Sequence, residues 1–225
     1  MQNFYLKNKQ KRRVKSLSAK NVVTNRLQKL SRNNESIHFL RAFLENPLHV
    51  GAISPSSPEL AKAMIEGIFP NEKNAVLEIG VGTGAITKFL QTRLKNKNSY
   101  IGIELNEKFV ELFRRRFPEL TIIQGDACRI TEIIQKERIQ TIRYIISSLP
   151  FASLPERTCK KIISEIDKLM VNGCLFRTFQ YAHCYYLSSA IEFRRYMNLK
   201  YGKAEKSRLI LKNVPPAYTL TWRTF

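Results

Sequence analysis

Cysteine, histidine and acidic side chains are scarce in this sequence, and long apolar runs are missing. Its 225 residues include 4 cysteines and 3 histidines. The cysteines form no CxxC pair and have no histidine at metal-ligand spacing, so neither a zinc site nor a disulfide framework is indicated. The longest stretch without a charged side chain runs from Thr178 to Ile191, which is too short to span a bilayer, and no signal-peptide core precedes it. We therefore expect a reduced, cytoplasmic protein without a bound metal, whose membrane contact is peripheral.

Basic side chains, in contrast, are abundant and unevenly placed. The chain has 38 Lys and Arg against 18 Asp and Glu, a net charge of +20, which favours polyanionic partners such as lipid surfaces or nucleic acid. Residues 1–32 hold ten of these cations and no acid. There Val23, Leu27 and Leu30 recur at helical spacing. We expect residues 1–35 to form a basic amphipathic helix that attaches to the anionic inner face of the cytoplasmic membrane. The alternative is a solvated helix packed on its own domain.

The remainder, residues 36–225, reads as one α/β domain. From Ala75 onward, short apolar runs alternate with amphipathic helical periods, a pattern that predicts a doubly wound, mostly parallel sheet with right-handed crossovers. The tail differs: residues 207–214 (SRLILKNV) and 217–225 (AYTLTWRTF), joined at Pro215-Pro216, predict a closing antiparallel pair. Residues 36–70 precede the sheet as a lid over substrate or cofactor. In this lid Ser57 can cap a helix that begins at Pro58.

The segment VLEIGVGTGAIT, Val76 to Thr87, places glycines at alternate positions between a strand and the next helical period. Such a turn is a site for a nucleotide-like ligand at the carboxyl edge of a sheet. Its spacing alone also fits a dinucleotide. However, Glu78 lies inside the pattern, where a carboxylate repels a pyrophosphate and attracts the ammonium group of a methionine moiety. The turn therefore favours S-adenosylmethionine (SAM).

Further polar residues follow the next strands. Glu104 ends the second strand, where a carboxylate can accept both ribose hydroxyls. Asp126 follows the third strand and either receives the adenine amino group or simply forms a Gly-Asp turn. The sequence SSLPF, residues 147–151, follows the fourth. Four strand ends with suitable chemistry, in series, are typical of a class I SAM-methyltransferase, a Rossmann-like fold.

Several segments together resemble a known family. FLENPLHVGAISPSSPELAKAM, VLEIGVGTGAIT, YIGIELNEKFVELFRRRFP, GDA, SSLPF, TFQY and NVPPA are similar to bacterial phospholipid N-methyltransferases of the small soluble type, which methylate phosphatidylethanolamine towards phosphatidylcholine. The resemblance runs from about Phe39 to Trp222 and leaves out the lysine-rich amino end. It implies SAM-dependent methylation of a lipid amine at the membrane surface, with SAM contacts at Glu78, Gly80, Gly82, Glu104 and Asp126.

The candidate site is therefore defined by residue. Methyl transfer needs a neutral amine held in line with the methyl donor, and little acid or nucleophilic help. Candidates for handling the amine proton or orienting the amine are Tyr181, His49 and Ser148. Aromatic faces at Phe151 and Tyr181 can stabilise a quaternary ammonium. The predicted cofactor contacts are Glu78, Gly80, Gly82, Gly84, Glu104, Leu105, Asp126, Ala127 and Ser147, and the predicted substrate contacts are Ser54, Ser56, Ser57, Phe151 and Tyr181.

Two other functions compete with lipid methylation. An RNA adenine dimethyltransferase is also basic and of class I, but such enzymes usually carry Asn or Asp where Ser148 stands, to bind the amino group of the base. The chain also ends soon after Trp222, without the helical carboxyl half of those enzymes. A non-catalytic SAM-fold protein that binds lipid or nucleic acid is the second alternative, against which the retained Glu78, Glu104 and Asp126 argue.

Overall fold

The computed structural model describes residues 56–71, 73–136, 141–171 and 173–225. The predicted basic helix of residues 1–35 and most of the predicted lid lie outside them. The described elements are the α-helices α2 (Pro58–Met64), α3 (Thr87–Leu90), α4 (Glu107–Arg116), α5 (Ile130–Lys136), α6 (Glu156–Leu169) and α7 (Ser188–Tyr201), and the strands β1 (Ala75–Ile79), β2 (Tyr100–Glu104), β3 (Thr121–Gln124), β4 (Ile142–Ser147), β5 (Leu175–Tyr181), β6 (Glu205–Lys206) and β7 (Ala217–Arg223).

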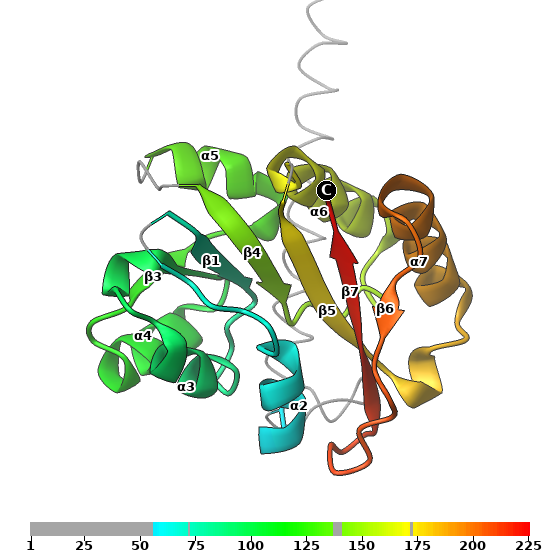
Figure 1. Ribbon diagram of the computed structural model, residues 1–225, viewed down its shortest axis with the longest axis horizontal. Helices are drawn as coiled ribbons and strands as arrows, with labels where there is room; N and C mark the ends of the chain where they lie inside the picture. Colours follow the sequence, from blue (N-terminus) through cyan, green and yellow to red (C-terminus); the bar gives the residue numbers. More distant parts are fainter. Residues whose placement is uncertain (1–55, 72, 137–140, 172) are drawn as a thin grey trace, which may run out of the picture. The chain divides into compact units, whose positions relative to one another are not determined.

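The sheet has seven strands in the order β3-β2-β1-β4-β5-β7-β6 (Figure 1). Strands β1 to β5 pair in parallel, and β7 pairs antiparallel with both β5 and β6. The strand order reverses direction between β1 and β4, which is the switch point where ligands bind in open α/β sheets. This topology confirms the predicted class I methyltransferase fold with a C-terminal antiparallel strand.

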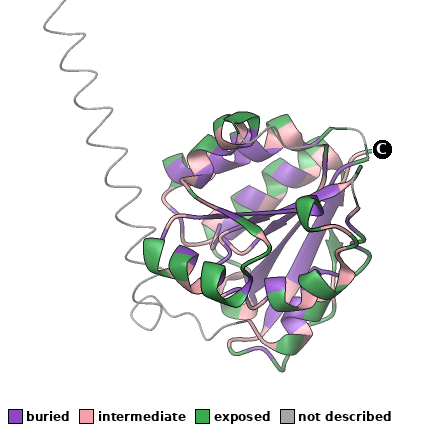
Figure 2. Cartoon of the chain, turned by 90° about the vertical axis from the view of Figure 1, so that its left-hand side faces the viewer, coloured by how far each residue is buried: buried purple, intermediate pink, exposed green. Residues whose placement is uncertain are grey.

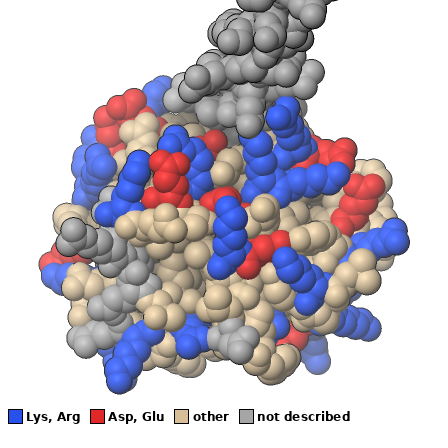
Figure 3. Space-filling view, turned by 90° about the horizontal axis from the view of Figure 1, so that it is seen from above, with Lys and Arg blue, Asp and Glu red and all other residues tan. Residues whose placement is uncertain are grey.

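Strands β1 and β5 are buried along their full length, as expected for strands covered by helices on both faces. Figure 2 shows these buried strands between helices that present exposed residues outward. The face over α5 and α6 carries Lys, Arg, Asp and Glu side chains interspersed (Figure 3). Among the described helices, none combines the length and the apolar character that a bilayer-spanning segment needs.

Helix α2 begins as the sequence predicts. Ser57 is its N-cap, and the Ser57 hydroxyl accepts the backbone N–H of Leu60 at 3.1 Å. Its buried residues Leu60 and Met64 are fully covered, which fixes the helix on the sheet. The other end of α2 is held by a feature that the sequence does not reveal. Arg177 on β5, only 5 % exposed, donates through Nη1 to the carbonyl oxygens of Ala63, Met64 and Glu66.

Two predictions need correction, and one helix was missed. The first strand of the closing pair is not at residues 207–214: β6 occupies Glu205–Lys206, and the segment after it forms turns with one bridge between Ile210 and Ala217. Asn213 hydrogen-bonds through its side chain, and Pro215 lacks the N–H that a ladder needs. The sequence predicts that the helix after the glycines begins at Ala85, whereas it begins at Thr87. Helix α7 was not predicted at all.

Candidate cofactor and active site

The glycine turn after β1 has the backbone that only glycine adopts readily. Gly80, Gly82 and Gly84 have φ values of 74°, 56° and 74°. A Cβ at Gly80 would lie 2.8 Å from the Leu149 side chain, and one at Gly84 would lie 2.5 Å from the Phe117 ring. A Cβ at Gly82 meets nothing within 4 Å. Packing therefore requires glycine at two positions, while the third leaves open space over the turn for a ligand.

Backbone hydrogen bonds bring the strand ends together at this turn. The N–H of Gly80 donates to the carbonyl oxygen of Ile103 on β2 at 2.9 Å. The N–H of Ser148, after β4, donates to the carbonyl oxygen of Ile79 on β1 at 2.9 Å. The N–H of Gly125, after β3, donates to the carbonyl oxygen of Glu104 at 2.9 Å. The predicted residues after β1, β2, β3 and β4 therefore share one edge of the sheet.

Glu78 is a fully buried carboxylate at the base of the turn. Its Oε2 accepts hydrogen bonds from the Thr87 hydroxyl at 2.8 Å and the Tyr100 hydroxyl at 2.9 Å. Its Oε1 is buried without a partner among the described residues. Burial raises the pKa of Glu78 to about 7, against the two hydrogen bonds, which lower it. An unsatisfied carboxylate oxygen fits a cationic ligand and is unsuited to a pyrophosphate.

Glu104 fixes the glycine turn from the neighbouring strand. It is 1 % exposed, and its two oxygens accept the N–H groups of Gly82 and Asn106, each at 2.8 Å. Burial raises its pKa, and these backbone N–H groups oppose the rise. Each carboxylate oxygen has a second lone pair, so ribose hydroxyls can still be accepted. Leu105, the next predicted contact, is half-buried.

Asp126 adopts the turn-forming role that the sequence left open. Its Oδ1 accepts the N–H of Cys128 at 2.8 Å and caps the 3-10 helix η3 (Ala127–Arg129). Asp126 is half-buried and Ala127 is buried. Because the N-cap contact does not use all of the carboxylate's lone pairs, the adenine role stays a prediction beside it.

Ser147, the last residue of β4, and Ser148, which follows it, differ in exposure. Ser147 is fully buried, and its hydroxyl accepts the N–H of Leu149 at 3.3 Å. Ser148 is half-buried and lies at the strand edge that carries the glycine turn. Its role in orienting a substrate amine stays a prediction.

Tyr181 ends β5 near α2. Its ring is 8 % exposed, stacks on His183 with centroids 5.7 Å apart and meets Phe179 edge-on at 5.4 Å. Burial raises the pKa of Tyr181 above its ordinary value. The phenol therefore stays protonated at neutral pH and can serve as a hydrogen-bond partner, not as a phenolate base. Ser56 and Ser57 precede α2 and are half-buried.

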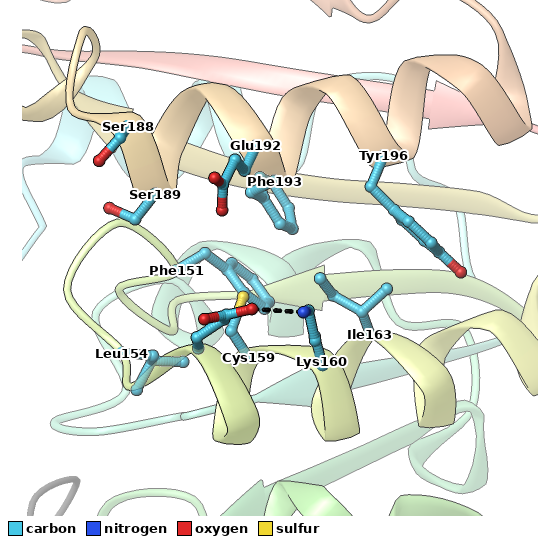
Figure 4. A pocket seen from close by; sticks show the side chains of 11 residues that line it. Phe151, Leu154, Cys159, Lys160, Ile163, Ser188, Ser189, Glu192, Phe193 and Tyr196 are labelled. Carbon is cyan, nitrogen blue, oxygen red and sulfur yellow. Dashed lines mark hydrogen bonds and ion pairs between the residues drawn. The ribbon is translucent and has the colours of Figure 1, made fainter.

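Phe151 lies in the core between the sheet and α7. Its ring stacks on Phe193 with centroids 4.4 Å apart and meets Phe176 edge-on. It lines a cavity of about 490 Å³ between α6 and α7, shown in Figure 4, together with residues such as Glu192 and Tyr196. This cavity is lined by neither the glycine turn nor Glu78, so its size does not make it the cofactor site. Phe151 thus packs in the core, and its substrate role stays a prediction. His49 and Ser54, the other predicted residues, lie outside the described residues.

The partners of Glu78 are the functional residues that sequence reasoning missed. Tyr100 opens β2, far from any glycine motif, and reads as an ordinary apolar strand residue. Thr87 reads as a helix start. For Tyr100 the signal is its spacing from Gly102: Glu78 pairs with Gly102, which has no side chain, and Tyr100 lies two residues earlier on the same face of β2.

Comparisons with known proteins agree with this geometry. Residues 76–173 match the family model described as "Methyltransferase domain". Over 141 residues the chain is 27 % identical to an ornithine lipid N-methyltransferase of Singulisphaera acidiphila, covering 61 % of this chain and 73 % of that enzyme. Over 93 residues it is 33 % identical to a probable ribosomal RNA small subunit methyltransferase A of Thermococcus kodakarensis, covering 40 % of this chain and 32 % of that protein.

Solved structures share the fold at low sequence identity. A SAM-dependent methyltransferase of Anabaena variabilis superposes with a TM-score of 0.56 at 13 % identity, covering 84 % of this chain and 93 % of that one. An rRNA methylase of Streptococcus thermophilus superposes with a TM-score of 0.55 at 14 % identity, covering 74 % of this chain and 95 % of that one. These likenesses concern the fold alone.

The fold is that of class I SAM-dependent methyltransferases, and residues 76–173, which include the glycine turn and its buried carboxylate, form a methyltransferase domain. Its cofactor is SAM, which fits the unpartnered Glu78 oxygen and the open space at Gly82. Glu78 would hold the ammonium group of the methionine moiety, and Glu104 the ribose hydroxyls.

Proposed function

We propose that the enzyme methylates the amine of an aminolipid headgroup, with phosphatidylethanolamine as its substrate on the way to phosphatidylcholine. The observation that carries the proposal is the share of each relative's length that aligns with this chain. The alignment covers 73 % of the ornithine lipid N-methyltransferase, but only 32 % of the ribosomal RNA methyltransferase. The preference for phosphatidylethanolamine over an ornithine lipid comes from the resemblance of the sequence motifs.

The chemistry of the site is compatible with this substrate. SAM supplies an electrophilic methyl group. The chain must then hold a neutral amine in line with that group and exclude water. Ser148 can orient the amine, and the Tyr181 phenol can hydrogen-bond it while staying protonated. Because neither side chain is a strong base, we propose that water takes the amine proton.

Attachment to the membrane is part of the same proposal. Residues 1–32 carry ten cations and no acid, and each cation near an anionic bilayer contributes about 1 kcal/mol, screened by salt. Deleting residues 1–32 should weaken sedimentation with anionic vesicles at 0.1 M salt while leaving the binding of S-adenosylhomocysteine unchanged. Vesicle binding that is equal in both proteins would contradict this role.

RNA methylation is the second candidate, supported by the net charge of +20 and by the ribosomal RNA relatives. The deciding experiment supplies methyl-labelled SAM with phosphatidylethanolamine vesicles, ornithine lipid vesicles and total RNA in parallel. The proposal predicts label in the phosphatidylethanolamine extract that is lost in Glu78→Gln. Label in ornithine lipid alone would change the substrate, and label in RNA alone would overturn lipid methylation. Cofactor binding without label in any sample would favour a non-catalytic SAM-fold protein.

A further inference from the structure

The connection between β6 and β7 exposes three aliphatic side chains. Leu209 is 36 %, Leu211 70 % and Val214 72 % exposed. We call these three residues the β6–β7 tip. Single exposed aliphatic residues are ordinary, but three within six residues form a local apolar patch, which marks an interaction surface.

Hydrogen bonds fix the backbone that carries the tip. Asn213 is 2 % exposed; its Oδ1 accepts the N–H of Ser57 at 2.9 Å, and its Nδ2 donates to the carbonyl oxygen of Pro215 at 2.7 Å. The N–H of Ile210 donates to the carbonyl oxygen of Ala217 at 2.9 Å. The connection is therefore anchored through Asn213 and Ile210, while Leu211 and Val214 remain in water.

The tip lies on the edge of the sheet that carries the cofactor site. Ala217, the first residue of β7, pairs with Tyr181, the last residue of β5, so the connection lies at the carboxyl ends of the parallel strands. The bond from Ser57 to Asn213 places it against the start of α2. Figure 1 shows this red-orange connection beside α2, below the strand ends.

Positive charge surrounds the tip. Residues 206–225 contain no Asp or Glu, and the exposed Arg208 and Lys212 flank the aliphatic side chains. Lys212 lies 3.6 Å from Glu59 but keeps a side chain that is 77 % exposed. On the face over α5 and α6, Lys and Arg side chains are interspersed with Asp and Glu (Figure 3).

We propose that the β6–β7 tip inserts into the interface of an anionic phospholipid bilayer, with Arg208 and Lys212 at the lipid phosphates. Exposed aliphatic side chains gain by leaving water, and the neighbouring cations gain by approaching anionic lipid, which is the combination that an interfacial segment needs. The tip thereby turns the carboxyl edge of the sheet, with Gly82 and Glu78, towards the membrane. The inference rests on the proposed lipid substrate and adds a contact that is independent of residues 1–35.

The first test uses the full chain and vesicles of phosphatidylcholine with one quarter phosphatidylglycerol. Leu211→Ser with Val214→Ser should lower vesicle binding about tenfold, also in 0.5 M salt, where attraction between exposed charges is screened. The control is Leu199→Ser: Leu199 is 80 % exposed, is followed by Lys200 and lies near the carboxyl end of α7, towards the opposite edge of the sheet. Binding of S-adenosylhomocysteine should stay the same in all proteins, which shows that they fold.

A second readout reports the tip directly. Leu211→Trp should give a tryptophan emission that shifts to the blue with these vesicles, whereas Leu199→Trp should give no shift; the natural Trp222 is 1 % exposed. Three results would each contradict insertion of the tip. These are wild-type vesicle binding by the serine double variant, an equal loss of vesicle binding in Leu199→Ser, and no emission shift for Leu211→Trp. Label in RNA with an intact tip effect would instead overturn the lipid substrate alone.

Discussion

The hydroxyl of Tyr100 lies 2.9 Å from Oε2 of Glu78, and both residues are buried beneath the glycine turn. This hydrogen bond, with that from Thr87, satisfies one oxygen of a carboxylate whose other oxygen has no partner among the described residues. Burial raises the pKa of Glu78 to about 7. The site therefore holds an acid that a cationic ligand would ionise fully.

Glu78→Gln should stabilise the free protein at alkaline pH and weaken its binding of ligand. Because the pKa of Glu78 rises from 4.5 to about 7 on folding, the folded state binds more protons in this interval, and the wild-type free energy of unfolding falls as the pH rises. At about 1.4 kcal/mol per pKa unit the loss approaches about 3 kcal/mol above pH 7. Denaturant titrations at pH 5 and pH 8 measure it.

In Glu78→Gln the free energy of unfolding should not fall between pH 5 and pH 8. Its affinity for S-adenosylhomocysteine should fall about tenfold because one charge-assisted hydrogen bond is lost. Glu132→Gln, at an exposed glutamate of α5, is the control and should show neither change. A wild-type stability that is the same at both pH values would contradict the raised pKa of Glu78.

Tyr100→Phe should shift the pH dependence of cofactor binding. The hydrogen bond from Tyr100 lowers the pKa of Glu78, so its removal raises that pKa, and a higher pH is needed to ionise the carboxylate. The binding midpoint for S-adenosylhomocysteine, followed by calorimetry from pH 5 to pH 9, should move upward. Thr87→Val should move it the same way, since the Thr87 hydroxyl donates to the same oxygen at 2.8 Å. Unchanged midpoints in both variants would disprove the coupling.

Gly82→Ala should weaken the binding of S-adenosylhomocysteine as well as lower the stability of the fold. Gly67 is a matched control, because both glycines have positive φ and open space where a Cβ would lie. Each alanine should cost about 1–2 kcal/mol of folding free energy for the left-handed backbone. Only Gly82→Ala places a methyl group in the proposed cofactor space, so only it should weaken S-adenosylhomocysteine binding about tenfold or more. Equal affinities in the two variants would argue against that space.

Arg177→Met should destabilise the domain by about 2–4 kcal/mol. Burial lowers the pKa of Arg177 to about 10, so it is charged at neutral pH, and its guanidinium also donates to Thr221 Oγ1 at 2.7 Å. Its loss removes a donor from the carbonyl oxygens of Met64 and Glu66 and leaves that of Ala63 with only the N–H of Glu66 at 3.4 Å. Arg223→Met, which removes a more exposed pair with Glu205, should cost less than about 1 kcal/mol. Urea unfolding compares them, and equal costs would refute the role of Arg177.

The sheet and the glycine turn could be predicted from the sequence because local patterns encode them. The strands β1 to β5 are short apolar runs separated by helical periods, and the turn at Gly80 to Gly84 needs residues that tolerate positive φ. Glu78 and Glu104 follow from their place at the strand ends. These features depend on neighbours along the chain.

The rest depends on contacts between distant residues. Helix α7 carries apolar residues on its exposed side as well as on its buried side, since Ile191 and Tyr196 are exposed while Phe193 and Met197 are buried, so periodicity did not reveal it. The position of β6 depends on its pairing with Leu220 and Thr221, and the apolar pattern of residues 207–214 belongs to the exposed tip. Tertiary packing overrides propensity at these places.

The central claim is that the open space over Gly82 binds a cationic methyl donor and not a phosphate-linked dinucleotide. Calorimetric titration of the full chain with S-adenosylhomocysteine and with NAD tests it most directly. The account predicts one S-adenosylhomocysteine bound per chain, with affinity that falls below pH 7, and no heat from NAD. Tight binding of NAD with no uptake of S-adenosylhomocysteine would contradict it.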